Sequence, residues 1–354
     1  MYWPTTEWKT VNPKEQKMDP DVISGLYEHI SANNLDIDSV LIIRNGYIID
    51  ENYLENRAIR SEMKFARNDA FIHDGKRHVL FSCTKSVASL LIGIAIEKGL
   101  IKNTKQKFFD IIPERWSDSY EERKKNITIG HILTMTSGIP WDLSKNNDVL
   151  KSITNTPLIN EPGVEFRYSA GVSLLTAAIQ KVAGIKASEF ARLHLFRPLG
   201  IPDEDWEWED NPQGYTKGGS GLWMTPHAMG KIGLLYLNMG VWDGTELVSS
   251  DWITRASTPH VCLKKASEWL DCEKFGNICT QTGMLPERAE CYGYLTWISR
   301  PKWYAATGMF SQRIYIIPDE NLVVVFTAHK HYESGDAIYT RILNDFIIGA
   351  IKNS

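Results

Sequence analysis

The stretch from Phe81 to Ile96 constrains this chain more than any other part of its sequence. Ser82 and Lys85 stand three positions apart, so on a helix their side chains share one face. The residues from Val87 onward are apolar on nearly every side, which predicts a buried helix. Burial disfavours the charged form of a lysine, and a neutral lysine can accept the proton of a serine hydroxyl. The spacing therefore predicts a nucleophile, Ser82, with its base, Lys85, one turn away.

A helix-capping serine followed by a lysine that reaches solvent is a common alternative explanation of this spacing. The pattern Ser-x-x-Lys occurs at three places, and only Ser82/Lys85 opens a long apolar helix. Ser61/Lys64 lies in a polar stretch, and Ser299/Lys302 is interrupted by Pro301. The functional interpretation therefore depends on motifs elsewhere in the chain.

Composition excludes several classes of function. The chain has 354 residues, of which 43% are hydrophobic and 23% are charged, and its net charge is −4. No basic block indicates nucleic acid, and the longest apolar run, within 87–96, is too short to cross a bilayer. No apolar signal segment follows Met1, so we expect a cytoplasmic protein if the chain is complete as written. If a signal peptide has been removed, we expect a secreted or periplasmic one.

The five cysteines leave the redox state open. Cys83, inside the Ser82 motif, is expected to be a small buried side chain. Cys262, Cys272, Cys279 and Cys291 fall in one segment without C-x-x-C spacing, which disfavours a zinc site. Two disulfides among these four, or four reduced thiols, are both compatible with the sequence. The oligomeric state is not determined by the sequence either.

Hydrophobic periodicity and breaker residues predict the order of the elements. A β-hairpin is expected at 40–49, turning at Asn45-Gly46. The expected helices cover 19–32, 82–99, 127–135, 172–182, 187–196, 225–238, 249–255 and 336–351. The expected strands cover 292–298, 303–307, 312–317 and 322–327, and the expected loops cover 55–78, 141–160 and 202–221.

This order predicts an α+β fold in a single unit over 1–354. The strands at both ends of the chain can pair into one antiparallel sheet flanked by helices. The expected α/β lobe comprises about 19–80 and 290–354. The expected helical lobe, about 100–240, is inserted between these two segments. A site is expected between the lobes.

Two further motifs carry chemistry. Tyr168 follows Pro162-Gly163 and precedes a helix, where a tyrosine can relay a proton to a leaving group. We expect the charge of Lys85 to lower the pKa of Tyr168. Ala306-Thr307-Gly308 lies at a strand end that can hold the backbone of a substrate. The N–H of Met309, which follows, can join that of Ser82 as an oxyanion hole.

In this order the motifs resemble the serine β-lactamase and penicillin-binding-protein superfamily, whose signatures include S-x-x-K and K-T-G. The resemblance is greatest to the class C-like branch of esterases, D,D-peptidases and 6-aminohexanoate-dimer hydrolases. It implies a β-lactamase/transpeptidase-like fold, with Ser82 as nucleophile, Lys85 as general base and Tyr168 as proton relay. Supporting segments are Leu133–Gly138, Gly218–Leu222 and Gln312–Pro318.

The chain departs from the pattern of true class C β-lactamases at two positions. Ala170 replaces the Asn of Y-x-N, and Ala306 replaces the Lys of K-T-G. The first change removes an amide that binds the acylamino group of the substrate. The second removes a cation that attracts the carboxylate of β-lactams and peptidoglycan stems. Both argue against β-lactamase or D,D-peptidase activity, whereas the esterase and dimer-hydrolase branch tolerates them.

The sequence therefore predicts a serine hydrolase that needs neither metal nor cofactor and acts on a carboxylic ester or small linear amide. Trp141 is expected to line the acyl pocket together with the strand residues Ala306, Thr307 and Gly308. His329 and His331 are expected at the surface. The alternatives are a D,D-peptidase or weak β-lactamase, and a non-catalytic module that senses acyl compounds. The natural substrate is not identified by the sequence.

Overall fold

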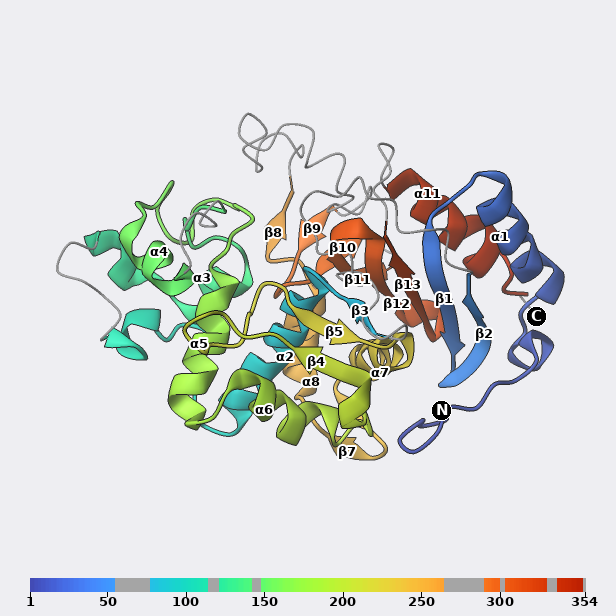
Figure 1. Cartoon of the computed structure of the whole chain (residues 1–354), viewed down its shortest axis with the longest axis horizontal. Helices are drawn as coiled ribbons and strands as arrows, with labels where there is room; N and C mark the ends of the chain where they lie inside the picture. The colour runs from blue at the N-terminus through green and yellow to red at the C-terminus, as the bar shows by residue number, and fades with distance from the viewer. Residues whose placement is uncertain are drawn as a thin grey trace.

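A large antiparallel sheet is the centre of the molecule (Figure 1). The computed structural model describes residues 1–54, 77–113, 121–141, 148–263, 290–299, 303–329 and 336–352. Eight strands of the sheet pair in the order β2-β1-β13-β12-β11-β10-β9-β8, so both ends of the chain contribute to it. In that order the strands are Tyr47–Tyr53, Ile37–Arg44, Leu322–Ala328, Gln312–Ile317, Trp303–Gly308, Trp297–Ser299, Cys291–Tyr292 and Val261–Cys262. The α+β fold class predicted from the sequence is confirmed.

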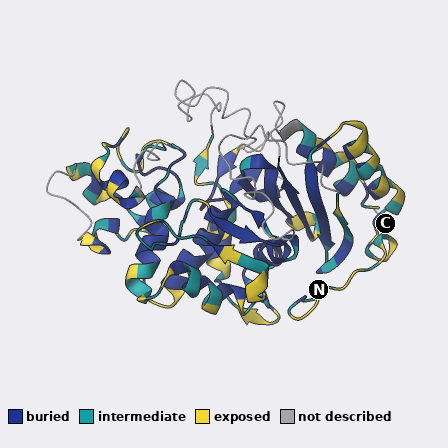
Figure 2. Ribbon diagram, in the orientation of Figure 1, coloured by how far each residue is buried: buried dark blue, intermediate teal, exposed yellow. Residues whose placement is uncertain are grey.

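The first hairpin shows why these residues form strands. β1 and β2 turn at Asn45 and Gly46, whose φ angles of 54° and 86° suit the tight turn of a two-residue hairpin loop. Along β1, alternate side chains enter different cores, because Leu41 and Ile43 pack on one face and Val40 on the other. The sheet is therefore buried on both sides, as the dark central strands of Figure 2 show.

Helices cover both faces of this sheet. One face packs against α1 (Pro20–Ala32), α11 (Asp336–Arg341) and the π-helical turn η10 (Ile342–Ile348). The other face packs against α7 (Pro226–Leu237) and α2 (Cys83–Glu97), which lies beside β11. The remaining described α-helices are α3 (Ile129–Leu133), α4 (Val149–Asn155), α5 (Val172–Ala183), α6 (Ala187–Ala191) and α8 (Ser250–Ser257). The division into two lobes at the boundaries given above stays a prediction.

The helix α2 is buried on all sides, as its composition predicted. Every residue from Cys83 to Ala95 is buried, between the sheet, α5 and α8. A Cβ atom added at Gly93 would lie 2.7 Å from the ring of Trp252, so only glycine allows this helix–helix approach. The described residues include no helix long and apolar enough to span a bilayer.

Three of the predicted elements differ from the structure. The single strand expected over 292–298 is wrong, because β9 and β10 pair with each other across a turn in which Leu295 has φ of 60°. The expected loop 202–221 contains β4 (Trp206–Trp208), which pairs with β5 (Leu222–Met224). The expected loop 141–160 contains α4. Periodicity failed here because elements of two to seven residues are too short to show a pattern.

Some predictions fall wholly or partly outside the described residues. The loop expected at 55–78 is described only at its last two residues, and β3 (His78–Val79) begins there and pairs with β5. Cys272, Cys279 and His331 also lie outside the described ranges.

Candidate active site

Ser82 stands at the entrance to α2, immediately after a sharp turn of the chain. The turn begins where the N–H of Leu80 donates to the carbonyl of Leu222 at 2.8 Å, which continues the pairing of β3 with β5. Phe81 then has φ of 46°, a conformation that a bulky side chain rarely adopts. Its ring packs against Phe310 with centroids 5.1 Å apart, and this contact helps to hold the turn. Such strain is typical of functional sites, where the surrounding packing compensates for it.

The hydroxyl of Ser82 contacts Lys85 and does not cap the helix. Its side chain makes no capping hydrogen bond, and the Nζ of Lys85 lies 2.9 Å from its Oγ. Lys85 is 2% exposed, and its Nζ also donates to the carbonyl of Gly219 at 2.6 Å. The capping interpretation of the Ser-x-x-Lys spacing is therefore wrong for this pair. The sequence did not predict that Gly219 contacts Lys85, although Gly218–Leu222 is one of the segments that support the resemblance.

Burial prepares Lys85 to act as a base. Desolvation lowers its pKa from 10.5 to about 7, so a large fraction of the amine is neutral near neutral pH. The N-terminus of α2 adds a partial positive charge beside Ser82, which favours a developing alkoxide. The amine of Lys85 lies 5.1 Å from the ring centroid of Tyr168 and 5.5 Å from that of Trp141. These rings shield it from water on that side.

Tyr168 lies next to the Ser82–Lys85 pair, as expected, but the prediction for its pKa was wrong. Burial raises the pKa of its phenol well above 10, and a hydrogen bond with Ser82 opposes this shift only in part. The sequence argument considered only the charge of Lys85, whereas the burial of the phenol has the larger effect. Tyr168 is therefore a neutral phenol near neutral pH, and a neutral phenol suits a proton donor better than a base.

Two tryptophans pack against the ring of Tyr168. Trp141 lies 5.2 Å from it between centroids, and Trp297 stacks on it at 5.8 Å with an interplanar angle of 18°. Tyr292 and Phe166 extend this aromatic wall by packing edge-on against Trp297. Trp141 was predicted near the acyl pocket and lies beside both Lys85 and Tyr168. Trp297 was missed because its strand is separated from Tyr168 by more than a hundred residues.

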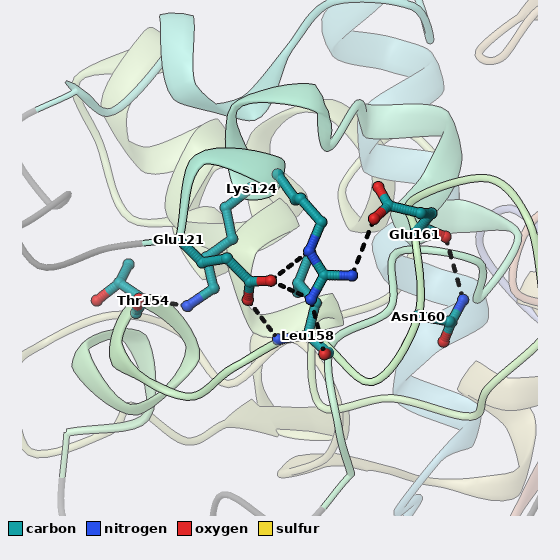
Figure 3. A network of polar contacts seen from close by, with 7 residues as sticks. Glu121, Lys124, Thr154, Leu158, Asn160 and Glu161 are labelled. Carbon is teal, nitrogen blue, oxygen red and sulfur yellow. Dashed lines mark hydrogen bonds and ion pairs between the residues drawn. The ribbon is translucent and has the colours of Figure 1, made fainter.

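A network of ion pairs and hydrogen bonds joins residues 158–161, which precede Tyr168, to Glu121 and Arg123 (Figure 3). Glu121 accepts from the N–H of Leu158 at 2.8 Å and pairs with Arg123. Arg123 also donates to Glu161 at 2.9 Å and to the carbonyl of Leu158 at 3.2 Å. The network fixes the chain shortly before it reaches Tyr168. Sequence reasoning missed these residues, because charged side chains in loops show no pattern that identifies their partners.

Backbone hydrogen bonds attach the same segment to the end of α3. The N–H of Gly163 donates to the carbonyl of Thr136 at 2.7 Å. The N–H of Arg167, the residue before Tyr168, donates to the carbonyl of Met135 at 2.7 Å. The segment Leu133–Gly138, noted in the sequence, therefore positions the tyrosine loop.

The strand β11 brings the third motif against Ser82. A Cβ atom added at Gly308 would lie 2.2 Å from the carbonyl oxygen of Leu80 and 3.1 Å from the N atom of Ser82. Only glycine permits this approach. Ala306 and Thr307 are buried on the same strand, and Met309 follows Gly308 directly. The use of the Met309 N–H as an oxyanion donor and the substrate-binding role of this strand stay predictions.

A buried cluster of one aspartate and two histidines lies at the end of the large sheet where β1 begins and β13 ends. The Nδ1 of His329 is 2.5 Å from Asp38, so the prediction of a surface position for His329 was wrong. His78 faces the other carboxylate oxygen at 3.9 Å, and burial lowers its pKa. The cluster connects β1 and β13 to the strand that precedes Ser82. Across the described ranges, no group of three or more His, Cys, Asp or Glu side chains is arranged to hold a metal ion.

Comparison with known proteins agrees with this geometry. A family model described as Beta-lactamase matches residues 39–346. The chain belongs to the Beta-lactamase family. Protein flp of Staphylococcus aureus strain MW2 is 24% identical over 246 residues, 62% of this chain and 47% of that protein. The chain thus spans about half the length of the curated relatives it matches.

Solved structures share the beta-lactamase fold over nearly the whole chain. EstCE1, a hydrolase with promiscuous acyltransferase activity, has a TM-score of 0.68 at 16% identity and covers 92% of this chain and 98% of its own. A protein from Bacillus anthracis assigned as a 6-aminohexanoate-dimer hydrolase has a TM-score of 0.65 at 16% identity, covering 97% and 87%. The resemblance to the serine β-lactamase and penicillin-binding-protein superfamily inferred from the motifs is therefore confirmed.

We expect Tyr168→Phe to separate two classes of substrate. The variant keeps the ring in contact with Trp141 and Trp297 but loses the phenolic hydroxyl, the expected proton donor. It should lower kcat at least about 10²-fold on alkyl esters and amides, whose leaving groups need a proton. The effect on p-nitrophenyl esters should be much smaller, because p-nitrophenolate leaves without one. Steady-state kinetics on matched acyl chains measure this difference, and equal losses on both classes would assign Tyr168 a structural role.

Proposed function

We propose that this enzyme forms an acyl-enzyme on Ser82 and hydrolyses neutral carboxylic esters or small linear amides. The observation that carries the proposal is the buried Lys85 amine, 2.9 Å from the Ser82 hydroxyl and with its pKa lowered to about 7. A serine has a negligible alkoxide fraction at neutral pH, so it needs a positioned base of this kind.

The mechanism follows from the positions of the groups. Neutral Lys85 takes the hydroxyl proton of Ser82 while its oxygen attacks the carbonyl carbon. The N–H groups of Ser82 and Met309 bind the oxyanion, a contribution of about 10²-fold or more per donor. Tyr168 gives its proton to the leaving group and is reprotonated from Lys85. Water then attacks the acyl-enzyme, and the same groups act in reverse.

The charges around the site favour a neutral substrate. Ala306 offers no cation on the strand beside the acyl carbonyl. Arg313, on the neighbouring strand, is fully buried against Tyr339 with its guanidinium carbon 4.5 Å from the ring centroid. Lys217 is paired with Glu209. A carboxylate entering the site would lose its hydration without gaining a partner from these residues.

The aromatic wall favours a substrate whose acyl or alcohol group is apolar. Trp141 and the ring of Tyr168 lie beside the amine of Lys85, and Trp297 stacks on Tyr168. Flat rings contribute apolar contact area and lose little conformational entropy when a ligand binds. We therefore expect Trp141, Ala306, Thr307 and Gly308 to contact the substrate.

A substrate panel with an active-site label tests the proposal. A fluorophosphonate probe should label Ser82, identified by mass spectrometry of the modified peptide. The protein should hydrolyse p-nitrophenyl esters or a 6-aminohexanoate amide faster than nitrocefin or a D-Ala-D-Ala peptide. Absence of labelling would favour a non-catalytic acyl-sensing module. Preferred turnover of nitrocefin or the peptide would favour a β-lactamase or D,D-peptidase.

Returning a cation to position 306 should change the charge preference. We expect Ala306→Lys to improve kcat/KM for an anionic substrate relative to its neutral methyl ester by about 10-fold, the value of a charge-assisted contact. The gain should shrink as salt is added. Ala306→Met is the matched control, because it adds a side chain of similar length without charge. An equal gain in both variants, or none in either, would contradict the role given to position 306.

A further inference from the structure

Two cysteines face each other across the outermost strands of the large sheet. Cys262 on β8 and Cys291 on β9 are register partners, and their sulfur atoms lie 3.5 Å apart without a bond between them. The N–H of Leu263 donates to the carbonyl of Glu290 at 2.8 Å, which makes the cysteines a non-hydrogen-bonded pair. The Cα atoms of such a pair are about 4.5 Å apart, and a disulfide spans about 4.4–6.8 Å. A cross-strand pair of this kind therefore suits the span of a disulfide.

The two thiols differ in access. Cys262 is exposed on the edge strand, whereas Cys291 is 3% exposed. An exposed thiol can react with a small disulfide from solution, and a neighbouring thiol can then resolve the mixed disulfide. This division is typical of redox-active pairs, in which the attacking cysteine is accessible and the second lies beside it.

We propose that Cys262 and Cys291 are a redox-active pair that closes into a cross-strand disulfide. The Cys262 thiolate attacks one sulfur of a low-molecular-weight disulfide such as oxidised glutathione, and the first glutathione thiolate leaves and takes a proton. The Cys291 thiolate then attacks the Cys262 sulfur of the mixed disulfide and expels the second glutathione. The pair loses two electrons and two protons, and the glutathione disulfide is reduced to two thiols.

The third described cysteine is set apart from this pair. Cys83 lies on α2, is fully buried and donates to the carbonyl of Gln312 at 3.3 Å. Burial raises the pKa of its thiol to about 12, so it stays protonated and unreactive. It provides an internal reference in the same chain, a thiol that oxidants and alkylating reagents should leave unmodified until the protein unfolds.

The pair adjoins the aromatic wall of the candidate active site. Tyr292 follows Cys291, and its ring lies 4.8 Å from that of Trp297, which stacks on Tyr168. A bond between β8 and β9 would fix the strand that carries Tyr292. It would also close a covalent ring from 262 to 291, which reduces the freedom of the unfolded chain.

Thiol mapping of the full-length protein tests the proposal. The protein is equilibrated in a series of glutathione redox buffers, its remaining thiols are alkylated, and unreduced peptides are identified by mass spectrometry. We expect a peptide linking Cys262 to Cys291 that appears in oxidising buffers and disappears when the buffer is made reducing. C262S and C291S should each abolish it, whereas the C272S/C279S double variant should retain it.

Other outcomes overturn the proposal. A link from Cys262 or Cys291 to Cys272 or Cys279, a link between two chains, or free thiols in every buffer would each refute the pair. The oxidised wild-type protein should also unfold about 5 °C higher than the reduced protein, a difference that C262S should lack. The bond should form equally in the Ser82→Ala variant, so its failure and the failure of the proposed hydrolase activity are distinguishable.

Discussion

Ser82→Ala should lower hydrolysis of the best ester at least about 10⁴-fold while leaving the folded state almost unchanged. The expected loss is large because no other group replaces the atom that forms the acyl bond. The expected effect on stability is small because the Ser82 hydroxyl makes no capping hydrogen bond to α2. Initial rates, fluorophosphonate labelling and thermal unfolding of the same samples measure all three consequences.

The control for this variant lies on the same helix. Ser89→Ala also removes a fully buried hydroxyl from α2, whereas the hydrogen bonds of the Lys85 amine go to Ser82 and Gly219. It should retain most of the activity and the labelling. If Ser82→Ala kept more than a few per cent of the wild-type turnover, or if both variants lost activity together, Ser82 would not be the nucleophile.

Lys85→Met should be nearly as inactive as Ser82→Ala. The pH dependence of the wild-type enzyme should show the same role of the Lys85 amine. Lys85 acts as a base only when it is neutral, and burial lowers its pKa to about 7. The wild-type kcat/KM should therefore fall about tenfold per pH unit below 7 and reach a plateau above it. Methionine fills a similar volume but accepts no proton, so its residual rate should lack this inflection.

Arginine at position 85 separates charge from basicity. Lys85→Arg keeps a cation at the site, but a guanidinium does not deprotonate in this pH range. We expect it to be as inactive as Lys85→Met at every pH. Activity of Lys85→Arg near that of the wild type would show that Lys85 acts through its charge and not as a base.

The same lowered pKa has a consequence for stability. Between pH 7 and 10.5 the unfolded chain binds a proton at Lys85 that the folded protein does not, so the free energy of unfolding rises with pH over this window. Lys85→Met removes this contribution. Its stability near neutral pH should match or exceed that of the wild type, although it loses the hydrogen bond to Gly219. A loss of activity without a loss of stability is the expected signature of the variant.

The sequence predicted the parts of the site that depend on local patterns. Ser82 and Lys85 are brought together by the geometry of one helix, and spacing alone contains that information. The apolar run that follows them also predicted the burial of α2. The long strands β11, β12 and β13 were predicted because each has six or seven residues of strand-favouring composition.

The missed features depend on contacts between distant segments. The carbonyl of Gly219 reaches Lys85, and the ring of Trp297 stacks on Tyr168, from parts of the chain far away in sequence. The pKa of Tyr168 was predicted in the wrong direction because the packing that buries it cannot be read from neighbouring residues. The surface position predicted for His329 was wrong because its partner, Asp38, comes from the opposite end of the chain.

The burial of α2 links catalytic competence to global unfolding. Amide groups in a helix that is enclosed on all sides exchange with solvent only when the whole domain opens, whereas edge strands and loops open locally. The candidate nucleophile and base therefore cannot be displaced by local fluctuations that leave the rest folded. The aromatic wall, by contrast, comes from loops and from the short strands β9 and β10. New substrate preferences can thus evolve through Trp141 or the β9–β10 hairpin, while Ser82 and Lys85 keep their geometry.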